Sequence, residues 1–149
     1  MAIVRSAGTE IIRSASFNDV DNTNQVLIQG VQHHIYTVLS IIIHTTAQSA
    51  TTNWLTVKLT GYDSKGGTTN TGMEVFRYDL ETHGTFVWND KFSFNGYEPV
   101  NFTGPLDDAT KQDAIADQGS GVAQVLSCYS DNASDSSRVH ITYIDQNNA

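Results

Sequence analysis

The sequence predicts an all-β protein, an antiparallel β-sandwich or jelly roll with one short helical insertion. β-Branched and aromatic runs alternate with clusters of Gly, Asn, Asp, Ser and Thr along most of the chain, which is typical of strands separated by turns. The chain shows no internal repeat and no alternation of strand and helix patterns. With 149 residues and two prolines, it has the size of a single domain, residues 1–149, with its own core.

The first third of the chain carries the strongest strand signals. Residues Thr9–Phe17 predict a first strand within an N-terminal strand or arm formed by residues 1–17, and the Asn- and Asp-rich residues 18–24 predict a loop. A strand restarts near Val26. Residues His34–Thr46 are almost continuously apolar and β-branched, which predicts a central strand covered on both faces over part of its length.

Alternation is clearest in Trp54–Thr60, which predicts a strand with one buried face. The residues predicted to point inward are Leu55, Val57 and Leu59. Residues 64–72 predict a polar loop, and Met73–Leu80 predicts a strand whose buried face the pattern does not decide.

A hairpin follows, with strands at Thr85–Trp88 and Lys91–Phe94. Asn89–Asp90 predicts the turn between them, and Asn95–Gly96 predicts a second turn. Phe86 and Trp88 are expected to share one face of their strand, and the same holds for Phe92 and Phe94.

The character of the chain changes over residues 100–120, which we interpret as an insertion. Good helix formers with Asp at the start predict a short helix at about residues 107–117. Strands resume at Val122–Tyr129 and Arg138–Ile144, separated by a polar turn. The total is seven to nine strands.

Charge and composition exclude several classes of partner. The formal net charge is −8 at pH 7, with the basic residues scattered singly, so nucleic acid is not expected as a partner. The longest apolar run, Val38–Ile43, contains Ser40 and is far too short to span a bilayer, so no membrane partner is expected either. The N-terminal residues lack the apolar core of a secretory signal, and we expect assembly in the cytoplasm of the producing cell.

Metal and cofactor chemistry find little support, and no cofactor is expected. The five histidines, at positions 33, 34, 44, 83 and 140, show no HxH or HExxH spacing, and His33 and His34 would point to opposite faces of a strand. Asp19–Asn24 supplies oxygen ligands at alternate positions, like the start of a calcium loop, but lacks the Gly and the closing Glu. An Asx-type turn is the better interpretation there.

Catalytic motifs are also missing, and we do not expect an enzyme. The chain has no GxSxG nucleophile motif, phosphate loop or dinucleotide fingerprint. Cys128, the single cysteine, lies in an apolar strand and is expected to be a small buried hydrophobe. No disulfide can form within the chain, so an oxidising compartment is not required.

The aromatic residues remain as candidates for an interface or for ligand stacking. The five singled out are Trp54, Trp88, Phe92, Phe94 and Tyr97. Alternation at period two favours a core or subunit interface for such rings. A carbohydrate-binding module is the alternative, and it requires exposed coplanar rings at Trp54, Trp88 or Tyr97.

From about Gly30 to Ile144 the layout resembles the small β-sandwich virion proteins of tailed bacteriophages, of the capsid decoration or cement type. The segments that carry the resemblance are Ile35–His44, Trp54–Thr60, Gly84–Phe94 and Val139–Ile144. Two departures are Asn95–Pro99, in place of a Gly-Asp turn, and the insertion at Val100–Ser120.

The resemblance implies a non-enzymatic virion component assembled in the host bacterial cytoplasm. The first expectation is a decoration protein that stabilises the head shell, with sister subunits in a homotrimer and the major capsid protein or other virion proteins as partners. A neck or tail accessory protein is the alternative. Family members carry no catalytic residues, so none is transferred to this chain.

Overall fold

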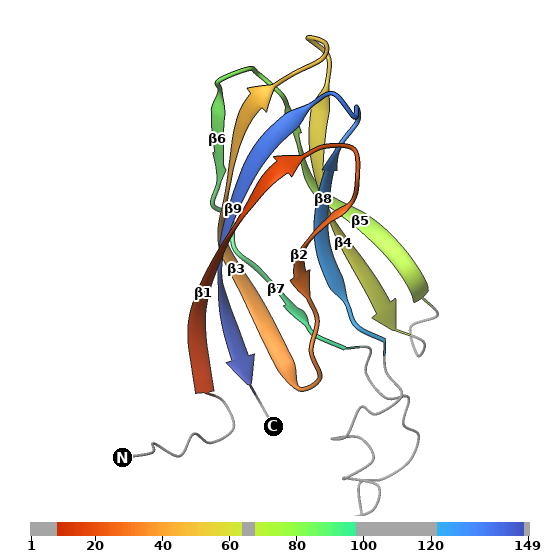
Figure 1. The fold of residues 1–149 in the computed structure, drawn as a ribbon. Helices are drawn as coiled ribbons and strands as arrows, with labels where there is room; N and C mark the ends of the chain where they lie inside the picture. The colour runs from red at the N-terminus through yellow and green to blue at the C-terminus, as the bar shows by residue number, and fades with distance from the viewer. Residues whose placement is uncertain (1–8, 64–67, 98–121, 148–149) are drawn as a thin grey trace, which may run out of the picture.

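The computed structural model describes residues 9–63, 68–97 and 122–147, which form a two-sheet antiparallel β-sandwich (Figure 1). The strands are β1 (Thr9–Val20), β2 (Gln25–Gln29), β3 (His34–Ala47), β4 (Trp54–Asp63), β5 (Thr68–Asp79), β6 (Thr85–Trp88), β7 (Phe92–Asn95), β8 (Val125–Ser130) and β9 (Ser136–Asn147). This part of the chain contains no helix. The helix expected at about residues 107–117, with its insertion, lies outside the described residues.

The strand order shows how the chain moves between two sheets. Sheet A has the order β1-β9-β3-β6, and β7 also pairs with β3, so that β6 and β7 together line one edge; sheet B has the order β2-β8-β4-β5. All of these pairs are antiparallel. Only the β4–β5 and β6–β7 connections stay within one sheet. All the other connections between successive strands cross from one sheet to the other.

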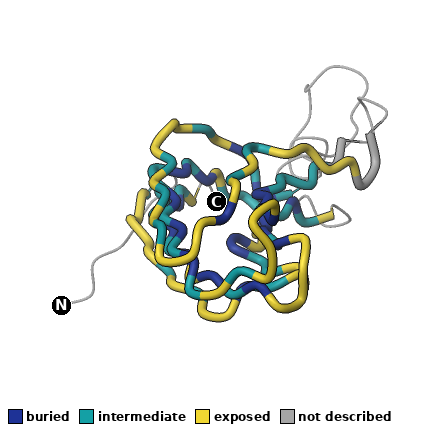
Figure 2. Tube along the Cα trace, turned by 90° about the horizontal axis from the view of Figure 1, so that it is seen from above, coloured by how far each residue is buried: buried dark blue, intermediate teal, exposed yellow. Residues whose placement is uncertain are grey.

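The hydrophobic core lies between the sheets, and buried residues recur along the strands among half-buried and exposed ones (Figure 2). Its fully buried members from sheet A are Val20, Val38, Ile41, Ile43, Val139 and Ile141. Those from sheet B are Leu55, Val57, Leu126 and Cys128. The inward face predicted for β4 and the burial predicted for Cys128 are therefore confirmed.

Within the described residues of a single chain, the double coverage predicted for the central strand is not seen. On β3, the inward side chains from Tyr36 to Thr45 are buried, but Ile35 is exposed and Ile42 and His44 are half-buried on the other face. No described element covers that face, because sheet B lies on the inner side alone. The run of β-branched residues reflects strand propensity as well as burial.

Several element boundaries differ from expectation, and two of them lie inside predicted loops. Strand β1 extends into the predicted loop as far as Val20, with an irregularity after Phe17 in which Asp19 takes a positive φ of 53°. Strand β5 begins at Thr68, inside the predicted polar loop, and threonine favours strands despite its polarity.

A close approach of three backbone segments, at Gly30–Val31, Gly96 and Gln124, closes the lower end of the sandwich. Gly30 N–H donates to Gln124 O at 2.9 Å, and Gln124 N–H donates to Gly96 O at 2.8 Å. A Cβ on Gly30 would collide with the Gly96 carbonyl, and a Cβ on Gly96 would collide with the Val31 backbone. The predicted hairpin of β6 and β7 is absent, because both strands pair with β3. The Asn95–Gly96 pair does end in a bend, in agreement with the predicted turn. Its glycine is needed because backbones meet there.

Candidate interaction surfaces

The outer face of sheet A, called here the sheet A face, consists of the outward side chains of β1, β9, β3, β6 and β7. Its apolar members are Ile12, Ile35, Ile42, Val87 and Ile144. Charged residues occur only toward its ends, with Glu10 near one end and Asp19 and Arg138 near the other. An antiparallel sheet ordinarily turns a solvated, polar face outward. This face is poor in charge on a chain whose net charge is −8.

Four hydrogen bonds between uncharged side chains tie neighbouring strands together across the sheet A face. They join Ser14 Oγ to Thr142 Oγ1 (3.1 Å), Ser16 Oγ to His140 Nδ1 (2.6 Å), Thr37 Oγ1 to Ser93 Oγ (2.8 Å) and His44 Nδ1 to Thr85 Oγ1 (2.8 Å). These contacts cross the β1–β9, β3–β7 and β3–β6 pairs. Cross-strand pairs of this kind stabilise a sheet and fix its side chains in place.

Strand β1 forms one edge of this face, and its free edge has no partner among the described strands. Ile12 points outward and is 73% exposed. Ile11 lies on the inner side of the same strand, yet it is 50% exposed. A long edge strand with apolar side chains exposed on both faces is a ready site for another chain.

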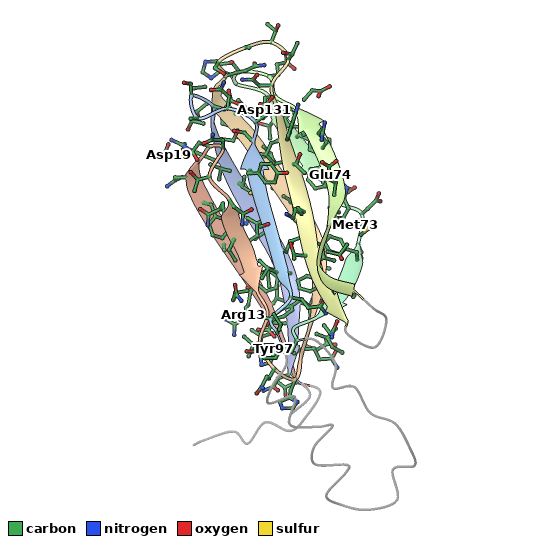
Figure 3. All side chains as sticks on the ribbon, turned by 90° about the vertical axis from the view of Figure 1, so that its right-hand side faces the viewer. Arg13, Asp19, Met73, Glu74, Tyr97 and Asp131 are labelled. Carbon is green, nitrogen blue, oxygen red and sulfur yellow. The ribbon has the colours of Figure 1, made fainter. Side chains whose placement is uncertain are left out.

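A charged cluster holds β1, β9 and β3 together near the lower end, where Arg13 and Tyr97 lie (Figure 3). Asp145 is buried; its Oδ2 accepts from Arg13 Nε at 2.8 Å, and its Oδ1 is bonded to His34 Nδ1 at 2.5 Å. Burial, followed by the nearby charge of Asp145, raises the pKa of Tyr36 to about 12. The cluster gives each oxygen of the buried Asp145 carboxylate a hydrogen-bonding partner.

Three of the five predicted aromatic residues pack between the sheets. Phe94 is buried, and Trp88 and Phe92 pack against the core. The Trp88 ring lies 5.2 Å from Phe76 and 5.4 Å from Phe92, measured between centroids. The shared faces predicted for β6 and β7 are confirmed by this packing. A role of these rings in an interface or in ligand stacking stays a prediction.

The other two aromatic candidates lie away from this cluster and from each other. Trp54 lies on the outer side of sheet B, where the Arg77 guanidinium sits 4.0 Å above its ring and Tyr129 meets its edge at 6.2 Å. One face of the indole is therefore occupied. Tyr97 is half-buried and forms an isolated bridge with Ala123. The described rings thus do not make a coplanar exposed platform for a sugar.

The histidine and calcium candidates are dispersed. His33 and His83 occupy turns with positive φ, His34 bonds Asp145, and His44 and His140 lie on the sheet A face. Within the described residues no three His, Cys, Asp or Glu side chains are grouped to hold a metal ion.

The predicted Asx turn is present at Asp21. Its Oδ1 accepts the Thr23 N–H at 2.7 Å, and this bond lowers the pKa of the Asp21 carboxyl. Among the described residues, no helix is long and apolar enough to cross a bilayer.

Neither a family model nor a curated protein matches the chain. One similar solved structure is of Bacillus endospore appendages, which form disulfide-linked pili (TM-score 0.44, 10% identity, covering 100% of this chain and 97% of the other). Another is of the T13 IBDV viral particle (TM-score 0.41, 10% identity, 99% of this chain), of whose chain this one spans 37%. Both TM-scores lie below 0.5, so neither likeness bears on function.

Proposed function

We propose that this chain is a non-enzymatic, jelly-roll virion structural protein, and specifically a capsid decoration or cement protein that stabilises the head shell. The chain crosses repeatedly between a five-stranded sheet, β1-β9-β3-β6/β7, and a four-stranded sheet, β2-β8-β4-β5, and this pattern supports a jelly roll. Its partners would be sister subunits, in a trimer, and the major capsid protein or other virion proteins. Assembly would take place in the bacterial host cytoplasm.

The observation that carries this proposal is the free edge of β1. Ile11 and Ile12 are exposed on opposite faces of this strand. Contact of both side chains with water is unfavourable, and another chain that covers them removes this cost. Edge strands in stable proteins are usually covered or blunted. A subunit that remains incomplete until it meets its neighbours is what an assembly protein requires.

The test is the molar mass of the purified protein by light scattering at micromolar concentration. A mass that is a multiple of three chains is expected, and the double variant Ile11→Glu/Ile12→Glu should lower it while the circular dichroism spectrum stays unchanged. A monomeric wild-type protein would contradict the decoration proposal. That outcome would favour a neck or tail accessory protein that associates only on docking.

A further inference from the structure

We propose that the sheet A face is an interface between two copies of this chain, which dock face to face about a two-fold axis. The inference rests on the assembly role proposed above, and it adds a second interface, which shares Ile12 with the free edge of β1 and otherwise lies on the other strands of sheet A. Its basis is the chemistry of the face, which suits a copy of itself better than a surface of different charge.

Charge is the first argument. A copy of this chain carries the same net charge of −8, so two copies repel each other, and a contact surface without charge avoids adding close pairs of like charges to that repulsion. Between Glu10 at one end and Arg138 at the other, the outward side chains of β9 and its neighbours are hydroxyl, imidazole, amide or aliphatic groups. An oppositely charged partner would find nothing on this face to attract it.

Symmetry is the second argument. At a two-fold interface the same patch is presented by both subunits, so groups near the axis meet their own kind. Serine, threonine and neutral histidine each donate and accept hydrogen bonds, so they can pair with themselves, whereas like charges cannot. The central residues Thr142, His140 and Ile42 are of these self-compatible types or apolar.

Size and order are the third argument. The face is four strand widths across, and roughly ten residues of β9 run along it, which at usual strand spacing and rise gives about 19 Å by 34 Å, or roughly 650 Å² in projection. A standard interface buries about 800 Å² per partner.

The four cross-strand hydrogen bonds already fix many side chains of the sheet A face, which reduces the entropy lost on docking.

The experiment compares matched glutamate variants of two half-buried threonines. Thr142→Glu places a charge in the middle of the sheet A face, on an interior strand. Thr60→Glu makes the same change on the outer side of β4, an interior strand of sheet B. Both variants add one negative charge, so a general increase in repulsion affects them equally. Val87→Glu, at a 54% exposed position of the short edge strand β6, provides a second variant that should tolerate the change.

Light scattering and sedimentation should give an even number of chains for the wild type. Thr142→Glu and Val87→Glu are expected to halve this mass, and Thr60→Glu should leave it unchanged. A wild-type trimer whose mass is the same in both sheet A variants would overturn the inference. The sheet A face would then bind some other partner, and the proposed assembly role would stand. A dimer that becomes a monomer would support the inference and contradict the trimer. An equal loss of molar mass in the Thr142→Glu and Thr60→Glu variants would also overturn the inference.

Discussion

Asp145 is a buried charge whose partners come from two other strands of sheet A. Because Arg13 and His34 each use one of its oxygens, Asp145→Asn must leave one of them facing an amide nitrogen. Hydrogen bonds to charged groups contribute about 1.5–3 kcal/mol, so we expect the free energy of unfolding to fall by about 1–3 kcal/mol. Urea denaturation followed by circular dichroism measures this change.

Asp131→Asn is the matched control for this measurement. Asp131 is exposed at the opposite end of the molecule (Figure 3), and its Oδ1 accepts the Trp54 N–H at 3.2 Å, a bond that an asparagine oxygen also accepts. The unfolding free energy of the Asp131→Asn variant should stay within about 0.5 kcal/mol of the wild-type value. Equal effects of the two substitutions would show that the Asp145 cluster adds no stability of its own.

Cys128 offers a second prediction for a single residue. Burial raises the pKa of its thiol to about 12, so the reactive thiolate is scarce at pH 8 in the folded protein. Ellman's reagent at pH 8 should therefore label the native protein very slowly and the urea-unfolded protein at once. Rapid labelling without denaturant would mean that the β8 strand opens readily to solvent.

At the scale of elements, sequence pattern predicts strands well and their surroundings poorly. The alternation in Leu55, Val57 and Leu59 identifies both a strand and its buried face, because one covered face imposes period two. The run around Ile42 does not reveal that its outer face is uncovered, since strand propensity and burial favour the same residues. Gly96 shows the same limit of local pattern, because the backbone that it approaches, at Val31, is distant in sequence.

Gly96 should be sensitive to the smallest substitution. In Gly96→Ala the new Cβ would collide with the backbone of Val31, and backbone cannot move aside as a flexible side chain can. We expect a loss of about 2–3 kcal/mol in unfolding free energy, in the range of overpacked sites. Gly72→Ala is the control, because its Cβ meets only the movable end of the Lys58 side chain. A Gly96→Ala protein as stable as Gly72→Ala would show that the lower end is loosely packed.

At the scale of the whole molecule, the candidate surfaces could not be read from sequence. Ser16, Ile42 and His140 lie far apart in the chain, and the pairing of β1, β9 and β3 makes them neighbours. Pairing of distant strands is not encoded in local periodicity. What the sequence does supply is composition: a strongly acidic chain whose strands nevertheless contain many uncharged hydroxyl and β-branched residues.

Salt dependence distinguishes the proposed interface from one made by opposite charges. Copies that each carry a net charge of −8 repel one another, and salt screens that repulsion over a Debye length of about 8 Å at physiological ionic strength. If the copies meet through the uncharged sheet A face, raising the sodium chloride concentration should leave the association as tight or make it tighter. Sedimentation equilibrium at low and high salt gives the dissociation constant in each condition.

Complementary charges would give the opposite result, because salt would then weaken binding. A dissociation constant that rises steeply with salt would therefore place the contact on a charged surface, such as the side of β5 that carries Glu74 and Arg77, rather than on sheet A.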